Sequence, residues 1–370
     1  MKILGIESSC DETAASVVEM NDVAAGATLL SSAVASSMDI HVQYGGVVPE
    51  IAARSHIESI LPVIKQALEE AECTWDDIDA IAVVYGAGLG GSLLIGVLTA
   101  RTLAITHSKP LYAINHVEAH VYANFISGGS DSPAMANYSF RSVPQFPMLA
   151  IIVSGGHSQL AVFDDHFKYT LLGQTQDDAI GEAFDKVAKI TGLPYPGGPS
   201  IAKAAAEGND HAFALPKAKM GKYDFSFSGL KTAVLRQSQA MIGKDYTFPS
   251  KDIASQLSEA QVADIAATFR RVAVETIVDK AITAFEEFAT VSVVIAGGVA
   301  ADRELRKQLT ERLAPLLLPT QTGNASIEFP DLKLCTDNGA MVACLGAYKA
   351  LLNQPTADPY TLDIAPNLSM

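Results

Sequence analysis

The chain has 370 residues, of which 49% are hydrophobic and 18% are charged, and its formal net charge is −15. This composition is typical of a well-packed globular enzyme of two or three domains, and it excludes a disordered or fibrous protein. The acidic balance argues against strong nucleic-acid binding by this chain alone, so such a partner would need a local basic patch or a basic companion protein. No apolar run approaches the roughly 18 residues of a membrane span. The four cysteines form no close pairs, which predicts reduced thiols in a cytoplasmic protein.

The chain begins with a predicted hairpin. Residues 2–6 are an apolar run typical of a buried strand, and residues 14–18 are a second such run. The polar tip between them carries hydroxyl groups and two acids, Asp11 and Glu12. Such a tip is either a solvated turn or a loop that meets a phosphate or its counter-ion, and composition leaves both interpretations open.

A glycine-rich turn occurs further along the first half of the chain. Residues 29–36 are predicted to form a third strand, a helix begins near Pro49, and residues 78–85 form another strand. The turn at 86–92 fits the G-x-G-x-x-G pattern of dinucleotide-binding proteins and leads into a helix. The acid expected about 20 residues later is absent, so a nicotinamide or flavin cofactor is not expected.

His116 and His120 lie four residues apart, directly after a predicted strand at 111–114. On a helix both imidazoles share one face and can reach one metal ion. The spacing is that of the H-E-x-x-H motif of zinc proteases, but Val117 occupies the place of the glutamate, and Glu118 points to roughly the opposite side of the helix. The pair is therefore either structural or part of a metal site that lacks the protease's base.

Residues 126–147 are rich in Gly, Ser, Asp, Asn and Pro, which is typical of a linker. We therefore predict an N-terminal lobe at 1–147 and a C-terminal lobe at 148–344. A C-terminal helix at about 345–370 is expected to pack back on the first lobe.

The second lobe is predicted to open as the first does. A strand at 148–153 leads into a small turn that contains Gly155 and Gly156, and a further strand follows. Backbone N–H groups in such turns form anion-binding nests, although a tight hairpin alone would need only one glycine. The repetition indicates a duplicated unit facing a cleft.

The remaining elements are mainly helical. A helix over 175–190 carries acids, among them Asp185, that suit its N-terminal dipole. Residues 251–289 are predicted to form two helices. Near the C-terminus Thr336 is expected to cap a helix of small residues, and Asp337 is either a partner of its dipole or a metal ligand.

Nine segments together resemble one family, the threonylcarbamoyl transferases called TsaD, once labelled O-sialoglycoprotein endopeptidases. The resemblance covers nearly the whole chain. The segments, in order, are IESSCDET (6–13), GGVVPEIAARSH (45–56), NHVEAH (115–120), VSGGH (153–157), DDAIGEAFDK (177–186), YPGGP (195–199), DFSFSGLKT (224–232), AGGVA (296–300) and CTDNGAM (335–341).

The resemblance implies an α/β architecture of the actin-like, sugar-kinase (ASKHA) type, with two ribonuclease-H-like lobes around a nucleotide cleft. It implies transfer of a threonylcarbamoyl group from threonylcarbamoyl-AMP to N6 of the adenosine 3′ of the anticodon, in tRNAs that read codons starting with A. The implied partners in bacterial relatives resemble a paralogous pseudo-enzyme, TsaB, and a small ATPase, TsaE. A membrane is not among the expected partners.

The resemblance also implies site residues. The implied ligands of one divalent ion, iron or zinc, are His116, His120 and Asp337. The implied contacts to the nucleotide and acyl group are Ile152, Val153, Ser154, Gly155, Gly156, Asp185 and Gly198. The family usually has asparagine, which contacts the adenosine, where this chain has Asp302. An aspartate accepts hydrogen bonds but cannot donate as the amide does, so Asp302 is expected to bind the substrate through a ribose hydroxyl.

The transfer reaction needs a base near the N6 proton, because the adenine amine is a poor nucleophile. Asp11 and Glu12 on the first hairpin tip are the candidates. A metalloprotease is a competing interpretation, but this chain lacks the glutamate that such an enzyme has next to its first histidine. An ATPase or sugar-kinase relative would bind adenylate equally well but leaves the metal triad unexplained.

Overall fold

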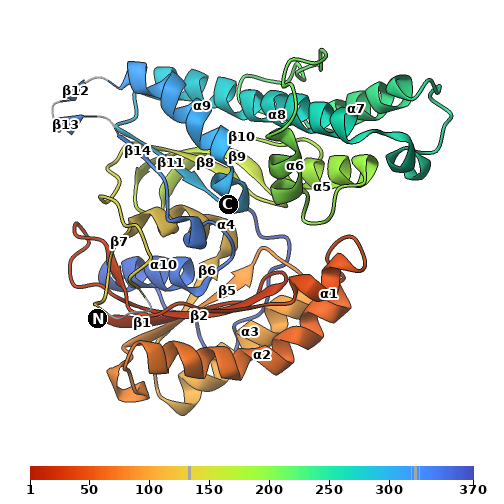
Figure 1. The fold of residues 1–370 in the computed structure, drawn as a ribbon. Coiled ribbons are helices and arrows are strands. Elements are labelled where there is room, and N and C mark those ends of the chain that lie inside the picture. Colours follow the sequence, from red (N-terminus) through yellow and green to blue (C-terminus); the bar gives the residue numbers. More distant parts are fainter. Residues whose placement is uncertain (132–134, 318, 321–322, 325) are drawn as a thin grey trace. The chain divides into compact units, whose positions relative to one another are not determined.

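A computed structural model describes residues 1–131, 135–317, 319–320, 323–324 and 326–370. The chain divides into two compact units, one formed by Met1–Pro144 with Glu328–Met370 and the other by Gln145–Ile327. Each unit contains its own β-sheet with helices packed on it (Figure 1). In the described part of the chain, no helix combines the length and apolarity that crossing a membrane would require.

The first unit contains a mixed sheet of strand order β6-β5-β1-β2-β3-β7, with β4 also paired to β2. Its elements are β1 (Lys2–Glu7), β2 (Glu12–Glu19), β3 (Ala27–Leu29), β4 (Ala33–Ser36), α1 (Met38–Val42), α2 (Pro49–Glu70), β5 (Ala80–Gly86), α3 (Gly90–Thr106), β6 (Leu111–Asn115), α4 (His116–Tyr122), β7 (Ile126–Gly129) and α10 (Gly339–Leu351). The predicted opening hairpin is confirmed, because β1 and β2 pair antiparallel. The predicted third strand at 29–36 is instead two short strands, β3 and β4.

Alternate residues of β1 face different helices. Leu4 and Ile6 belong to a core shared with α2 and α3, which cover one face of the sheet. Gly5 faces α10, which packs on β1 and β2 from the other side. Since successive strand residues point to opposite faces, this alternation places the sheet between two helical layers (Figure 1).

Helix α10 lies directly against the centre of the sheet. A Cβ on Gly5 would collide with the backbone of α10 at Gly339 and Ala343, so glycine permits the close approach. This packing places residues 328–344 in the first unit. The predicted second lobe, 148–344, includes most of these residues, which differs from the division that the contacts give. The reason is that the contact with β1 joins segments more than 300 residues apart.

The second unit is built on a sheet of order β10-β9-β8-β11-β14. Its elements are β8 (Met148–Val153), β9 (Ser158–Asp165), β10 (Lys168–Gln174), α5 (Ile180–Thr191), α6 (Gly197–Ala205), α7 (Ser228–Met241), α8 (Glu259–Phe288), β11 (Ser292–Ala296), α9 (Arg303–Leu313), the short pair β12 (Pro319–Thr320) and β13 (Gly323–Asn324), and β14 (Ser326–Glu328). Strands β8 and β9 pair antiparallel, whereas β8 and β11 are parallel neighbours. The carboxyl ends of β8 and β11 therefore lie at one edge of the sheet.

Candidate metal and nucleotide sites

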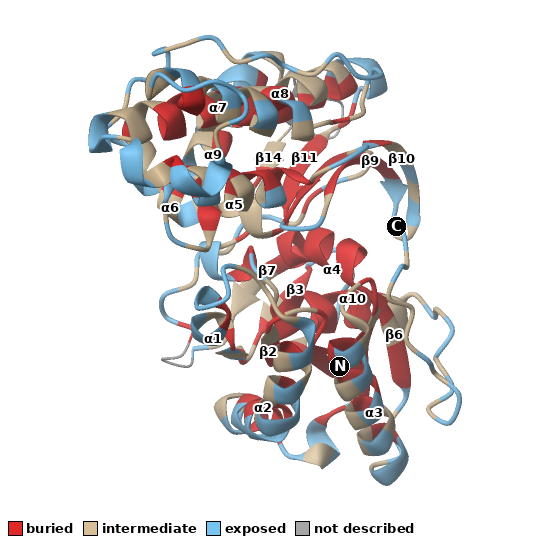
Figure 2. Cartoon of the chain, turned by 90° about the vertical axis from the view of Figure 1, so that its right-hand side faces the viewer, coloured by how far each residue is buried: buried red, intermediate tan, exposed pale blue. Residues whose placement is uncertain are grey.

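The histidine pair lies on α4, a short helix that is buried along its whole length (Figure 2). Asn115 begins this helix, and its side chain accepts hydrogen bonds from the backbone N–H groups of Val117 and Glu118 at 2.9 and 3.3 Å. This cap satisfies two of the N–H groups that a helix start leaves without partners. The sequence thus places the helix cap at Asn115, one residue before the first histidine, and the helix carries both imidazoles on the same face.

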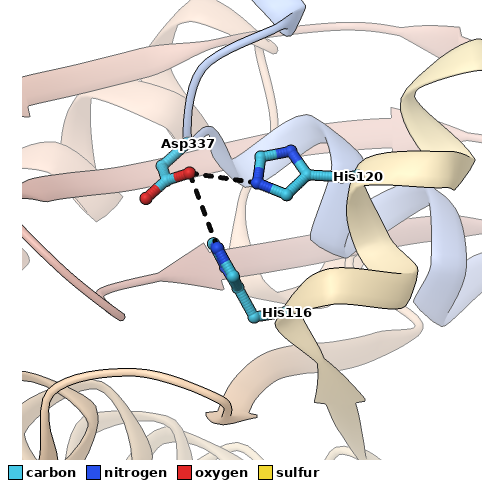
Figure 3. Close-up of side chains that lie close together, drawn as sticks. All are labelled: His116, His120 and Asp337. Atoms are coloured by element: carbon cyan, nitrogen blue, oxygen red, sulfur yellow. Dashed lines mark ion pairs between the residues drawn. The ribbon is translucent and has the colours of Figure 1, made fainter. Parts of the chain in front are cut away.

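His116, His120 and Asp337 converge in the first unit (Figure 3). Asp337 Oδ1 lies 3.2 Å from His120 Nε2 and 3.6 Å from His116 Nε2. One ligand atom from each residue lies within 4.8 Å of the other two, and both histidines are buried. The structure therefore brings together the three residues that the resemblance implied as metal ligands.

Asp337 lies in the turn before α10, and its neighbour Asn338 fixes that turn. The Asn338 side chain accepts from Met341 N at 2.9 Å and donates to the carbonyl oxygens of Leu334 and Thr336 at 3.1 and 2.7 Å. Asn338 is therefore the helix cap, and the expectation that Thr336 caps α10 is wrong. Because α10 begins at Gly339, the cap position falls on the residue directly before it.

Glu7 orients the first histidine. Its Oε2 lies 3.1 Å from His116 Nδ1, its Oε1 accepts from Ser9 N, and the carboxylate is fully buried. A carboxylate accepts but cannot donate, so Nδ1 of His116 carries a proton, and Nε2 is the ring nitrogen that faces Asp337. Histidine ligands of metals are commonly held by a carboxylate in this way.

The charges around these histidines are predominantly negative. Burial opposes a charged imidazole at His116, but the carboxylates of Asp337 and Glu7 more than offset it and raise the pKa of His116 to about 9. Burial, followed by the charges of Asp337 and Asp11, raises the pKa of Glu12 well above its usual value. Several acids thus act on one another and on His116 within a small region.

The residues present fit a metal ion. His120 is buried, and neither of its ring nitrogens makes a hydrogen bond of good geometry to a described residue, although Asp337 lies within ion-pair distance of Nε2. A buried polar group left in this way is costly, and coordination by Nε2 would remove the cost at that nitrogen. Two imidazoles and one carboxylate are also a donor set that divalent transition metals accept. The cluster could therefore hold one divalent ion.

Of the two acids proposed as bases, Asp11 lies at the tip between β1 and β2, and Glu12 is the first residue of β2. Asp11 is buried, and its Oδ2 has no hydrogen-bond partner among the described residues, whereas Glu12 Oε1 accepts from Ser36 Oγ at 3.3 Å. His56 on α2 fixes this tip. Its Nδ1 lies 2.7 Å from Thr13 Oγ1 and its Nε2 lies 3.0 Å from the carbonyl oxygen of Cys10. The tip is thus held on both sides of the acid pair.

In the second unit, a glycine turn follows β8. Ser154 Oγ accepts from His157 N at 3.1 Å, and Ser154 N donates to His157 O at 2.8 Å, which closes the turn. A Cβ added to Gly155 or Gly156 would meet no atom within 4 Å. Neither glycine has the positive φ that would exclude other residues. The chain itself therefore does not require glycine here, and space is left in front of the turn.

Gly198 and Asp185 lie at a second part of the same unit. Asp185 Oδ1 accepts from Gly197 N at 2.7 Å at the start of α6, while a Cβ at Gly198 would enter open space. Burial raises the pKa of Asp185, and the hydrogen bond from Gly197 opposes this rise. Asp185 thus shapes the glycine-containing start of α6.

The side chains of the remaining residues predicted to contact the nucleotide are occupied by contacts within the protein. The side chains of Ile152 and Val153 are fully buried at the end of β8, so only their backbone can reach a ligand. The Asp302 carboxylate caps α9 and forms an ion pair with Arg270. It is therefore engaged within the protein.

Comparison with known proteins gives one consistent result. The family model of TsaD, tRNA N6-adenosine threonylcarbamoyltransferase, matches residues 28–344. Two relatives with that name are similar over almost the full length. The protein of Dehalococcoides mccartyi strain BAV1 is 44% identical, and the alignment covers 100% of this chain and 99% of the relative. The protein of Symbiobacterium thermophilum is 45% identical, and the alignment covers 94% of this chain and 91% of the relative. The chain belongs to the TsaD family.

The fold of this TsaD family member is of the actin-like, sugar-kinase type, as the sequence predicted. A solved structure of full-length HypF, in a phosphate- and nucleotide-bound form, aligns with 95% of this chain and 46% of that chain. The TM-score is 0.55 and the sequence identity is 14%, so the likeness shows the fold alone.

Two residues of this TsaD site, Glu7 and His56, were not predicted from the sequence. Both lie inside segments that carry the family resemblance. Glu7 contacts a histidine 109 residues away, and His56 contacts the hairpin tip 43 residues away. Local spacing carries no signal for such contacts, and only membership of a recognised segment could have marked either residue.

Proposed function

We propose that this chain transfers the threonylcarbamoyl group of threonylcarbamoyl-AMP to N6 of the adenosine 3′ of the anticodon in tRNAs that read codons starting with A. Membership of the TsaD family, with relatives of that name over almost the full chain, is the observation that carries this proposal. The experiment that tests it follows labelled threonine into tRNA.

The proposed reaction is an acyl transfer from a mixed anhydride. The N6 nitrogen attacks the carbamoyl carbonyl carbon, a C–N bond forms, and the C–O bond to the AMP phosphate breaks. AMP leaves with the electron pair, and the N6 proton passes to a base. Asp11 suits this role because its buried Oδ2 has no donor among the described residues, and Glu12 is the alternative.

We assign the metal site to His116, His120 and Asp337, with iron or zinc as the ion. Both metals accept two imidazoles and a carboxylate, with open coordination positions left for a substrate. When bound, such an ion acts as a Lewis acid that polarises or orients the oxygens of the acyl group. Glu7 holds His116 in the tautomer that coordination requires.

We assign the adenylate to the open glycine turns of the second unit. Ser154, Gly155 and Gly156 follow the carboxyl end of β8, and ligands of α/β proteins bind outside such strand ends. Backbone N–H groups of a glycine turn bind phosphate, and a glycine admits a ligand where a Cβ would exclude it. The open space at Gly155, Gly156 and Gly198 supports this assignment.

The proposed partners are tRNA, a TsaB-like paralogue and a TsaE-like ATPase. A formal charge of −15 disfavours strong tRNA binding by the isolated chain, so companion proteins are expected to supply part of the tRNA surface. Helices α2 and α3 pack on each other and carry five exposed large apolar side chains. These are Ile57, Leu61, Leu94, Leu98 and Ile105. We define them as the α2–α3 face and propose that it binds the TsaB-like paralogue.

Charges placed on the α2–α3 face are expected to prevent that association. Leu61 and Leu98 are 62% and 44% exposed, so Leu61→Asp with Leu98→Asp should leave the fold of the isolated chain intact. Burying an unpaired carboxylate in an interface costs several kcal/mol, so we expect a loss of about a hundredfold or more in affinity for the paralogue, measured by titration calorimetry. Phe288→Asp, at an exposed apolar side chain of the second unit, is the control. Equal affinity of the double variant and the wild type would rule out this face.

A further inference from the structure

We propose that Arg270, held in place by Asp302, donates a hydrogen bond to the nucleoside part of the bound adenylate. The inference rests on the proposed function, which places an adenylate in the second unit. Arg270 would then supply the donor that the asparagine amide supplies in the family pattern. It is a specificity-determining residue outside the nine segments that carry the resemblance.

Arg270 and Asp302 form a two-pronged ion pair between α8 and the start of α9. Arg270 Nε donates to Asp302 Oδ2 at 2.9 Å, and Nη2 donates to Oδ1 at 3.0 Å. The two side chains are only 15% and 9% exposed. Such planar, two-point pairing fixes the orientation of the guanidinium group as well as its position.

The Asp302 carboxylate has little capacity left for a ligand. Its Oδ1 accepts from Glu304 N at 2.8 Å and from Leu305 N at 3.0 Å, in addition to Arg270. Its Oδ2 accepts the second bond from Arg270. Asp302 therefore positions other groups, and a direct contact to the adenosine is better made by its partner.

Arg270 retains unused donors. A guanidinium group has five N–H bonds, and the ion pair uses two of them. The other three have no acceptor among the described residues, and Nη1 is not among the buried atoms without a partner, so the free edge of the guanidinium group reaches solvent. Because these N–H groups are fixed in direction and open to solvent, they are suited to a ligand that supplies acceptor oxygens or ring nitrogens.

The pair lies where a nucleotide is expected in this unit. Residues 297–302 follow the carboxyl end of β11, the parallel neighbour of β8. A Cβ at Gly297 would collide with the carbonyl group of Val153, so this loop lies directly against the start of the glycine turn at 154–156. Arg306 Nε also donates to the carbonyl oxygen of Ala300 at 2.6 Å, which fixes the loop. The loops after β8 and β11 thus form one edge, with Arg270 tied to it.

The chemistry of the pair explains why aspartate suits this chain. An asparagine at 302 could still cap α9 through its carbonyl oxygen. Its NH₂ group would then face Arg270 Nε–H in place of Oδ2, so that two donors would oppose each other. Aspartate at 302 and arginine at 270 are therefore expected to depend on each other, as residues in one network do.

The test measures binding of AMP and of adenosine to the full chain by titration calorimetry or competition. Arg270→Lys keeps the charge but loses the planar fork, and we expect its affinity for both probes to fall about tenfold or more, as loss of a charged hydrogen bond predicts. Asp302→Asn should weaken both probes as well. The double variant Arg270→Gln with Asp302→Asn should bind no more weakly than Arg270→Gln alone. Arg312→Lys, which disturbs the Asp279 pair of the same unit, is the control.

Each outcome decides the inference. An equal fall in affinity for AMP and for adenosine, with unchanged affinity in the control variant, supports the role proposed for Arg270. A fall for AMP alone would place Arg270 on the phosphate and overturn it. Unchanged affinity for both probes, with only a lowered melting temperature, would make the pair purely structural and also overturn it. Failure of the wild-type chain to bind AMP would instead overturn the proposed nucleotide site itself.

Discussion

Replacement of His116 or His120 with alanine is expected to remove most of the metal that the purified protein carries. Each substitution deletes one of three protein ligands. Loss of an outer-shell partner alone costs about ten- to a hundredfold in metal affinity, and loss of a ligand should cost more. Glu7→Gln should give the smaller effect, since the amide keeps an acceptor near His116 Nδ1 but loses the charge. The measurement is metal content by elemental analysis, followed by titration of the metal-free protein.

The control for these variants is His107→Ala. His107 lies in the same unit, stacks on Trp75 at 4.1 Å between ring centroids, and is not a member of the cluster. The metal content of His107→Ala should equal that of the wild type, and circular dichroism should show that every variant is folded. Full metal occupancy in both His116→Ala and His120→Ala would refute the assignment of this site.

Gly155→Val is expected to abolish transfer while leaving the protein folded. A Cβ at Gly155 meets no atom within 4 Å of the chain, so the added side chain costs the fold little. It would instead occupy the space proposed for the phosphate. Displacement of a substrate by about 1 Å already costs about a hundredfold in rate, and we expect a loss of at least that size. The measurements are the rate of tRNA modification, the affinity for AMP and the melting temperature.

Gly229→Val is the matched control, because a Cβ at Gly229 also enters open space but lies on α7. It should retain transfer and AMP binding. The metal content of Gly155→Val should equal that of the wild type, since the metal ligands belong to the other unit. Wild-type AMP affinity in Gly155→Val would show that the glycine turn is not the nucleotide site.

Local patterns were sufficient for much of the fold. Alternation and apolar runs predicted β1, β2, β8 and β11, because a buried strand needs a continuous apolar run. The four-residue spacing of the histidines placed both on one face of α4. The helix expected over 175–190 begins only at Ile180, because Asp177 instead binds Ser226, Phe227 and Ser228 at the start of α7. An acid that complements a helix dipole and an acid that binds a distant segment look the same in the local sequence, so Asp177 could not be assigned from it.

Long-range partners could not be predicted from spacing. Glu7 and His56 act on residues far away in the chain, and Arg270 pairs with Asp302 from another helix. Residues 251–289 were expected to form two helices, but a single helix, α8, runs from Glu259 after a capping box at Ser258. The helix that carries Arg270 is thus continuous. Such features depend on which segments meet in space, and that information is absent from any window of the sequence.

The most direct test of the account follows labelled threonine into tRNA, with the chain, ATP, bicarbonate and the partner proteins present. We predict label on N6 of the adenosine 3′ of the anticodon, in tRNAs that read codons starting with A. Transfer should depend on Gly155 and on the metal ligands His116, His120 and Asp337. Unlabelled tRNA under these conditions, together with metal-dependent cleavage of a glycoprotein by the same preparation, would contradict the account.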